Sequence, residues 1–307
     1  MHSQKVPVFR TTLTDDDESR HRPSYEGVHY TRMKPTAPSW RLRRYGNLIV
    51  NRLFPLRKTQ IDGLKFRYFA AESPPQDPRE FVNTGLEFHH RISRLSGWEA
   101  IDVGANIGSY TLRLARTFHS VTAFEPSPAH NKVLRLNIAL NSLKNVHVRE
   151  VALSDVSGIS PLYIRAGATS LDMFHYGLGY DSVCLVRTAK LDEYQTKFTK
   201  LDLVKIDAEN LEYAILKGGI GMISRFRPVI AVEVHRSRVL SNGSCICDVC
   251  KLLQNHRYDT EVTGESSSIG MVHWVWATPN IESMVSLGLH QHRVQGTRHA
   301  YCKSFCR

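Results

Sequence analysis

The chain reads Ala100-Ile101-Asp102-Val103-Gly104-Ala105-Asn106-Ile107-Gly108-Ser109-Tyr110 where an apolar run gives way to two closely spaced glycines. The run through Val103 predicts a buried strand, and the residues from Ser109 predict an amphipathic helix. Glycine suits the turn between them because a side chain would hold the backbone away from a ligand, and a helix start presents N–H groups. The segment therefore indicates a ligand site at the end of a strand.

Short apolar runs alternate with amphipathic segments from residue 98 onward, which is typical of βαβ units and a mostly parallel sheet. Strands are expected at residues 100–103, 120–124, 146–151, 201–206, 229–234, 258–262 and 271–277. Helices are expected at 109–118, 129–140, 211–216 and 246–254, and Pro128 suits a first helical turn. The expected fold class is α/β, with a seven-stranded, mostly parallel sheet and helices on both faces.

A carboxylate, Glu125, follows the second expected strand. At this position it is placed to accept hydrogen bonds from both hydroxyls of a ribose. A nicotinamide dinucleotide site has Gly-x-Gly-x-x-Gly, whereas this chain has Gly104 and Gly108 with Asn106 in place of the second glycine. Because a side chain there obstructs a pyrophosphate, we expect S-adenosylmethionine, which has no phosphates. Asp102 is expected either to stabilise the turn or to hold the ammonium group of that cofactor.

These segments resemble the FkbM family of methyltransferases. The resemblance covers residues 98–277 and is carried by five segments in order, at 102–108, 124–128, 137–141, 152–155 and 205–209. It implies a Rossmann-like class I methyltransferase fold and methyl transfer from S-adenosylmethionine to a hydroxyl of a saccharide, glycolipid or secondary metabolite. The cofactor-binding residues that we expect are Asp102, Gly104, Ala105, Asn106, Gly108, Glu125, Pro126, Ala152, Asp155 and Asp207.

Two positions leave alternatives open. The resemblance implies that the turn at 152–155 lies beside the adenine, but Asp155 also suits a plain turn before Gly158. The family usually continues Asp-Val-Glu-Gly-Ala-Glu after the fourth strand, whereas this chain reads Asp207-Ala208-Glu209-Asn210-Leu211-Glu212. Asn210 tolerates the left-handed conformation, so we expect the turn to survive. Leu211 is larger than alanine, which leaves the shape of the substrate entrance and the activity level open.

A neutral hydroxyl must lose its proton during methyl transfer, so a general base is needed at the carboxyl ends of the strands. Asp207, Glu233 and His235 are the expected catalytic residues, and period-two alternation puts Glu233 and His235 on one side of their strand. The alternative for Asp207 is a helix N-cap, and for His235 a structural hydrogen bond. Asp207 and Glu233 would suit Mg²⁺, but we predict no metal.

The six cysteines are sparse for 307 residues, so reduced thiols are expected. Cys245, Cys247 and Cys250 have a spacing that would suit a metal, and His299, Cys302 and Cys306 are further donors in the sequence. The first three overlap an expected amphipathic helix whose apolar positions they fill. We therefore predict no metal there, and the role of this cysteine cluster stays open.

The formal net charge of +11 is concentrated in two segments. Residues 41–58 carry six basic residues and 291–307 carry four, and neither segment has an acidic one. The remaining chain is close to neutral, which argues against nucleic acid as a partner. The stretch at 40–56 predicts either a helix packed on the main domain or, through residues 41–58, a peripheral contact with anionic lipid or a lipid-linked substrate.

Four regions are expected: a poorly ordered tail at 1–40, a basic extension at 41–97, the methyltransferase domain at 98–280 and a basic tail at 281–307. No apolar run is long enough to cross a bilayer, so we expect a cytoplasmic protein. The loop at 166–180 predicts a substrate lid, with Phe174, His175, Tyr176 and Tyr180, or a plain surface loop. The rival functions are a NAD-dependent oxidoreductase and an inactive methyltransferase fold that binds without turnover. The oligomeric state is left open.

Overall fold

The computed structural model describes residues 56–69, 86–165, 168–172, 180–235, 247–266 and 272–280. The expected tails at 1–40 and 281–307 lie outside these residues, as does the helix expected at 40–56 apart from its last residue. Phe174, His175 and Tyr176 of the expected lid also lie outside them, and so does Cys245. The predicted domain boundaries therefore stay predictions.

The main sheet has seven strands, as the sequence predicts. They are β3 (Gly97–Val103), β4 (Phe118–Phe124), β5 (Val146–Arg149), β10 (Leu203–Ile206), β11 (Val229–Val234), β12 (Tyr258–Ser266) and β13 (Val272–Pro279). Their order is β12-β13-β11-β10-β3-β4-β5. The pairs among β11, β10, β3, β4 and β5 are parallel, and β13 is antiparallel to both of its neighbours.

The carboxyl ends of the parallel strands lie at the same level, and ligands can bind there. Val103 of β3 pairs with Ile206 of β10 and with Phe124 of β4. The buried apolar runs fix this register, because a slip by one residue would turn each core side chain toward the opposite face. The residues that follow β3, β4, β10 and β11 therefore leave the sheet side by side.

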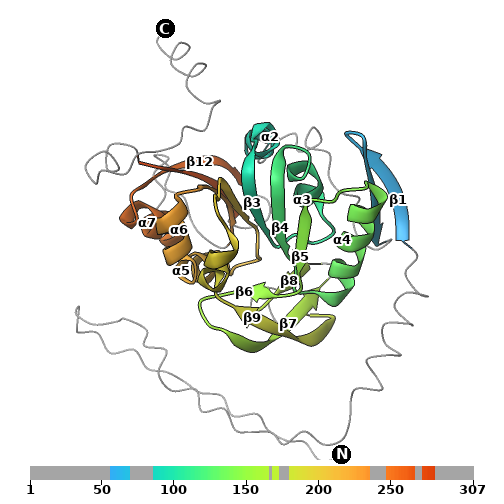
Figure 1. Cartoon of the computed structure of the whole chain (residues 1–307). Coiled ribbons are helices and arrows are strands. Elements are labelled where there is room, and N and C mark those ends of the chain that lie inside the picture. Colours follow the sequence, from blue (N-terminus) through green and yellow to red (C-terminus); the bar gives the residue numbers. More distant parts are fainter. Residues whose placement is uncertain are drawn as a thin grey trace, which may run out of the picture. The chain divides into compact units, whose positions relative to one another are not determined.

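Helices cover both faces of the sheet, as expected. They are α2 (Leu86–Arg94), α3 (Ser109–Leu114), α4 (Pro128–Leu140), α5 (Glu212–Lys217), α6 (Ile220–Phe226) and α7 (Asp248–Asn255), with a 3-10 helix η1 (Leu191–Lys197). One core joins Ile101 and Val204 to α5, α6 and α7, and a second joins Ala100 and Leu203 to α2 and α3. Figure 1 shows α5, α6 and α7 grouped on one side and α4 beside β5 on the other.

Several boundaries differ from the sequence prediction. Helix α3 ends at Leu114 instead of Phe118, because Phe118 begins β4. Helix α7 begins at Asp248 because Cys247 is its N-cap. Pro128 does occupy the first turn of α4, after the N-cap Ser127. Helices α2 and α6 and the 3-10 helix were not predicted.

A second, four-stranded sheet was also not predicted. It contains β6 (Ala152–Leu153), β7 (Gly158–Arg165), β8 (Ala168–Ser170) and β9 (Ser182–Ala189), in the order β6-β9-β7-β8. Strand β8 lies within the segment expected to be a loop at 166–180.

An antiparallel hairpin of β1 (Leu56–Ile61) and β2 (Leu64–Phe69) lies against α4. The Asn137 amide donates to the carbonyls of Arg67 and Ile107 and accepts from Arg67 N, at 2.7 to 3.0 Å. The Asn141 amide likewise accepts a hydrogen bond from Lys65 N and donates one to the carbonyl of Lys65. The two asparagines thus fix the hairpin to the helix. Among the described residues, no helix combines the length and hydropathy that a membrane span requires.

Candidate functional site

The turn after β3 brings the backbone of two strand ends into contact. Gly104 has φ +73°, and a Cβ on it would lie 1.8 Å from the carbonyl oxygen of Asp207. Only glycine allows this approach, because any side chain would overlap that carbonyl. Asn106 (φ 49°) and Gly108 (φ +100°) complete a turn with three left-handed residues. The loop after β3 and the end of β10 therefore form one continuous surface.

The loop amides already have acceptors within the protein. Gly104 N and Ala105 N both donate to the carbonyl of Phe124 at 3.0 Å, and Gly108 N donates to Ala105 at 2.8 Å. A dinucleotide site needs amides that point at a pyrophosphate, so this pattern opposes the nicotinamide alternative. Asn106 is the exposed member of the loop. It is the residue that a ligand approaching this edge would meet.

Glu125 joins the two loops that flank the site. Its side chain is 2% exposed, and its two oxygens accept from Asn106 N and Ser127 N, each at 2.8 Å. Burial raises the pKa of this carboxyl above its usual value. Each oxygen retains a second lone pair. Glu125 thus has a structural role in holding the two loops together, and its expected contact with ribose hydroxyls stays a prediction. Pro126 is half-buried between these partners.

Asp102 and Lys205 form a buried ion pair. The Asp102 side chain is fully buried and accepts from Thr111 Oγ1 at 2.5 Å, and its other oxygen lies 3.2 Å from Lys205 Nζ. Lys205 Nζ also lies 3.6 Å from Asp207 Oδ2. Burial alone would lower the pKa of Lys205, but Asp102 and Asp207 outweigh it and raise that pKa. The Asp102 side chain has no exposed surface, and its expected contact with a cofactor ammonium group stays a prediction.

Lys205 and its neighbours are site residues that the sequence analysis missed. Lys205 Nζ lies 4.6 Å from the centre of the Tyr110 ring, and the Tyr110 hydroxyl is hydrogen-bonded to His89 Nδ1. Burial, together with the charge of Lys205, lowers the pKa of His89 to about 4, so its imidazole is neutral. The signal in the sequence was a lysine inside the otherwise apolar strand Leu203–Ile206. A buried lysine needs paired acids, which would have pointed to Asp102 and Asp207.

The three expected catalytic residues do come together. One ligand-type atom from each of Asp207, Glu233 and His235 lies within 4.8 Å of the other two. Glu233 and His235 face the same side, with His235 Nε2 3.9 Å from Glu233 Oε1. Asp207 is not a helix N-cap, because the N-cap of α5 is Leu211. The alternative structural role for Asp207 is therefore removed.

His235 carries a positive charge at neutral pH. Its Nδ1 lies 2.9 Å from Glu212 Oε1, and its Nε2 lies 3.5 Å from Glu209 Oε2. Burial alone would lower the pKa of His235, but Glu212, Asp207 and Glu209 outweigh it and raise the pKa to about 10. A general base must start unprotonated, so the expected base role does not fit His235 at neutral pH. Its hydrogen bond to Glu212 favours the structural alternative.

Glu233 holds its proton at neutral pH. Burial, followed by the nearby charge of Asp207, raises the pKa of this carboxyl to about 8. Its expected catalytic role is therefore that of a hydrogen-bond donor and not of a base. Asp207 is the remaining carboxylate of the three, with a side chain that is 29% exposed. The ammonium of Lys205 beside Asp207 would repel a divalent cation, which opposes Mg²⁺ binding here.

The turn after Asp207 has the backbone shape expected from its sequence. Glu209 and Asn210 both have positive φ, at 52° and 78°. Asn210 Nδ2 donates to Asp172 Oδ2 at 2.7 Å, and Ser170 Oγ donates to the carbonyl of Glu209 at 2.7 Å. The end of β8 thus holds this turn. Leu211 is partly buried and packs against the apolar core that includes α5.

The expected adenine side is formed by the start of the second sheet. Ala152 is buried in β6, and Asp155 lies in the turn before Gly158. Asp155 Oδ2 lies 2.9 Å from Lys217 Nζ, and this hydrogen bond lowers the pKa of the carboxyl. This arrangement agrees with the turn alternative for Asp155. Its contact with an adenine stays a prediction.

Two further expectations change. Cys250 is disulfide-bonded, so the expectation of reduced thiols does not hold for this residue. Arg57 and Lys58, at the end of the basic stretch 41–58, lie on strand β1. The proposed lipid contact through 41–58 concerns residues that are mostly outside the described ranges.

Known proteins resemble parts of the chain. A tRNA/tmRNA (uracil-C(5))-methyltransferase from Marinomonas sp. (strain MWYL1) is 29% identical over 110 residues, which cover 36% of this chain and 30% of that protein. Methyltransferase sdnD from Sordaria araneosa is 28% identical over 152 residues, which cover 38% of this chain and 59% of that protein. The chain thus spans less than two thirds of either relative. A crystal structure of methyltransferase FkbM from Methylobacillus flagellatus KT matches 60% of this chain and 44% of its own at 17% identity, with a TM-score of 0.42.

The relative from Marinomonas overturns one expectation. Its name assigns it to tRNA and tmRNA, so the argument against nucleic acid as a partner was wrong. That argument used charge summed over long segments, which does not report the local surface around a site.

The strand order, the glycine turn and the carboxylates at the strand ends agree with one family. The methyltransferase FkbM domain matches residues 102–260, slightly more than half of the chain, and this range includes every expected site residue. The nicotinamide oxidoreductase alternative is therefore excluded, and the chain belongs to the FkbM methyltransferase family.

Proposed function

We propose that the chain transfers a methyl group from S-adenosylmethionine to a hydroxyl oxygen of a saccharide, glycolipid or secondary metabolite, with Asp207 as the general base. The observation that carries this proposal is the position of Asp207. Its backbone touches the glycine turn at Gly104, and its side chain lies in the acidic cluster at the end of β11. One residue thus joins the proposed cofactor side to the proposed acceptor side.

The turn after β3 fits the proposed cofactor. Its amides are used within the protein, and Asn106 projects at the exposed edge, which suits a ligand with polar groups and no phosphates. Glu125 would accept from the ribose, and Ala152 and Asp155 would flank the adenine. S-adenosylmethionine supplies an electrophilic methyl group when it is bound. The protein then has to position the acceptor and remove its proton, and positioning alone contributes about 7–11 kcal/mol.

The charge states of the cluster assign the other roles. As the acceptor oxygen bonds to the methyl carbon, the carbon–sulfur bond of the cofactor would break to leave S-adenosylhomocysteine, and the hydroxyl proton would pass to Asp207. The charged His235 and the protonated Glu233 are hydrogen-bond donors and would orient further oxygen atoms of a hydroxyl-rich acceptor. Lys205 is a positioning residue, because its Nζ lies 3.6 Å from Asp207 Oδ2 and attracts that carboxylate.

Ligand binding and turnover test the proposal in sequence. Calorimetric titration should show micromolar binding of S-adenosylmethionine and none of NAD. Release of S-adenosylhomocysteine should then be measured with hydroxylated glycans, glycolipids and unmodified tRNA as acceptors. Release with a hydroxyl acceptor supports the proposal. Release with tRNA alone, and a methyl group found on a base, would replace the proposed acceptor.

Asp207→Asn should lower kcat by about 10²–10⁴, the usual contribution of a general base, with unchanged affinity for S-adenosylmethionine. The matched control is Asp259→Asn. Asp259 is an exposed aspartate near the start of β12, at the opposite edge of the sheet, and this variant should keep the wild-type rate. Equal kcat values for wild type and Asp207→Asn would remove Asp207 from the chemistry.

A further inference from the structure

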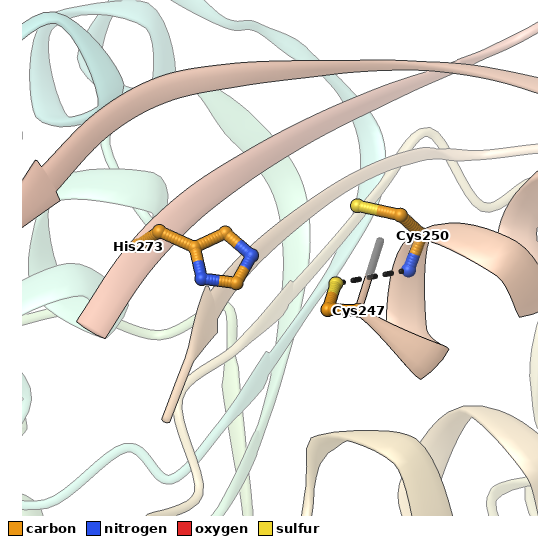
Figure 2. Close-up of side chains that lie close together, drawn as sticks. All are labelled: Cys247, Cys250 and His273. Carbon is orange, nitrogen blue, oxygen red and sulfur yellow. Dashed lines mark hydrogen bonds between the residues drawn. The ribbon is translucent and has the colours of Figure 1, made fainter. Parts of the chain in front are cut away.

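A second cluster of ligand-type side chains lies inside the apolar core, on the face covered by α5, α6 and α7. Cys247, Cys250 and His273 are 4%, 0% and 0% exposed. One ligand atom from each lies within 4.8 Å of the other two. Figure 2 shows the His273 ring facing the two cysteines at the start of α7. Two sulfurs and an imidazole thus converge in a place that water does not reach.

The two cysteines have a local geometry that favours thiolates. Cys247 is the N-cap of α7, and its Sγ accepts a hydrogen bond from Cys250 N at 3.3 Å. An N–H donor and the positive end of a helix both stabilise negative charge on sulfur. The spacing of three residues at the helix start also brings both sulfurs to one side.

The third donor comes from a separate element. His273 lies on β13 and pairs with Val234 of β11, so it reaches the cluster from the sheet while the cysteines reach it from the helix. In tetrahedral zinc sites, bonds of about 2.3 Å to sulfur and 2.1 Å to nitrogen place neighbouring ligand atoms roughly 3.5–3.8 Å apart. Separations within 4.8 Å therefore need only small side-chain shifts. Thiolate and imidazole donors are the set that selects zinc over magnesium or calcium.

We propose that Cys247, Cys250 and His273 bind Zn²⁺ in the reduced protein. Two thiolates would neutralise the charge of the ion, and one tetrahedral position would remain for a further donor. Because all three side chains are buried, the site is structural and ties α7 to β13.

Reduction has to precede metal binding. Cys250 is disulfide-bonded in the structure, and neither of the other two described cysteines is its partner. A dithiol reductant would break this sulfur–sulfur bond, supplying two electrons and two protons while it becomes a disulfide itself. Zinc binding would then release the protons of the Cys247 and Cys250 thiols. The disulfide-bonded and the zinc-bound states therefore exclude each other.

The proposed zinc site is distinct from the methyl-transfer site. Glu233 and His235 point to one face at the end of β11, and Val234, between them, points to the other face. His273 pairs with Val234 on that second face. A zinc ion there would lie behind the end of β11 and take no part in proton transfer.

Metal analysis of the full chain tests the proposal. Protein reduced with a phosphine and dialysed against zinc should retain about one zinc per chain by mass spectrometry. Co²⁺ in place of zinc should give the intense near-ultraviolet bands of thiolate ligation. Zinc should also raise the Tm of the reduced wild-type protein, because it binds only the folded form. Protein with the Cys250 disulfide intact should show none of these effects.

Variants identify the ligands. Cys247→Ser, Cys250→Ser and His273→Asn should each lower zinc affinity by at least tenfold. Cys184→Ser is the matched control, because Cys184 lies on β9 in the other sheet, and it should bind zinc as the wild type does. Two results would overturn the proposal: fully reduced wild-type protein without zinc or cobalt binding, or metal binding that Cys247→Ser leaves unchanged. The cobalt spectrum of the wild type decides the matter even if a variant fails to fold.

Discussion

Gly104 and Gly63 differ in why the chain needs glycine at each position: both have a left-handed backbone, but only Gly104 also lies against another backbone segment. Both have left-handed backbones, with φ of +73° and +76°. A Cβ on Gly104 would overlap the carbonyl oxygen of Asp207, whereas a Cβ on Gly63 would have no atom within 4 Å. Substituting Gly63 therefore measures the cost of the left-handed backbone alone, whereas substituting Gly104 adds the cost of the overlap with Asp207.

We predict that Gly63→Ala lowers the free energy of unfolding by about 1–2 kcal/mol, the cost of a left-handed alanine. Gly104→Ala should lose this amount plus about 1–3 kcal/mol or more from overpacking. It should also weaken the binding of S-adenosylmethionine, because the loop must move away from β10. Urea denaturation and calorimetry measure both effects. Equal losses of stability in the two variants would show that the Asp207 contact is unimportant.

The positions of the expected catalytic side chains could be predicted from the sequence, but their charge states could not. Asp207, Glu233 and His235 follow strand ends, and alternation along one strand is a local property that the sequence displays. The pKa of His235 depends on Glu212, which reaches it from α5. The pairing of Asp102 with Lys205 depends on two strands that lie next to each other in the sheet. Such contacts follow from the tertiary arrangement and not from spacing along the chain.

At the scale of elements, the hairpin β1–β2 depends on two asparagines of α4. Each makes three side-chain hydrogen bonds to backbone groups. Asn137 is fully buried and also holds the carbonyl of Ile107 in the glycine turn. Asn141 is half-buried, and its partners on Lys65 are exposed. The two residues therefore differ in whether water can replace the lost bonds.

We predict that Asn137→Ala costs about 2–4 kcal/mol, because buried backbone groups lose their partners. Asn141→Ala should cost about 1 kcal/mol, since water re-forms the hydrogen bonds at an exposed site. Chemical denaturation gives both values, and hydrogen exchange of β2 amides should accelerate more in Asn137→Ala. The account is refuted if the exposed position proves the more sensitive one.

Elements of the main sheet were predictable, whereas the second sheet was not. The strands β3, β10 and β11 each contain a short run of mostly buried apolar residues, interrupted only by Asp102, Lys205 and Glu233, and such runs are visible in the sequence. In β7 and β9 the apolar residues Ile159 and Leu185 are exposed, and polar residues interrupt them. Leu162 and Val186 of the same strands are buried, so apolar residues lie on both faces and the sequence shows no clear alternation between apolar and polar residues.

For the molecule as a whole, the matched domain does not contain every element that supports the site. It spans residues 102–260, but β13 and α2 lie outside it. From α2, His89 reaches Tyr110, whose ring contacts the ammonium of Lys205. The end of β11 is likewise flanked by Trp274 and His273 of β13. Elements beyond the matched domain therefore help to shape the proposed active site.

The stability of the whole chain should depend on pH through His235. Its pKa rises from 6.5 to about 10 on folding, so its contribution to stability is complete below pH 6.5 and is lost as the pH rises through 10. Glu233, whose pKa rises from 4.5 to about 8, lowers stability progressively as the pH rises from 4.5 to 8, and its contribution is constant above pH 8. Between pH 8 and 10 the change in stability with pH therefore comes from His235 and not from Glu233.

We predict that the difference in free energy of unfolding between wild type and His235→Gln is largest below pH 6.5 and shrinks between pH 8 and 10. Chemical denaturation at several pH values measures it. His147→Gln, at an exposed position of β5, is the control and should show no such trend. A difference that stays constant with pH would contradict the charged state of His235.

Glu209 and Asn210 are two successive residues in a backbone region that costs energy for any residue other than glycine. The hydrogen bond from Ser170 to Glu209 and the one from Asn210 to Asp172 keep them there, two and three residues beyond the proposed base. Residues in and just after β8 thus hold a strained turn close to the proposed base. This turn costs some folding free energy, and a rigid backbone beside Asp207 would fix the direction of the proposed base before an acceptor binds.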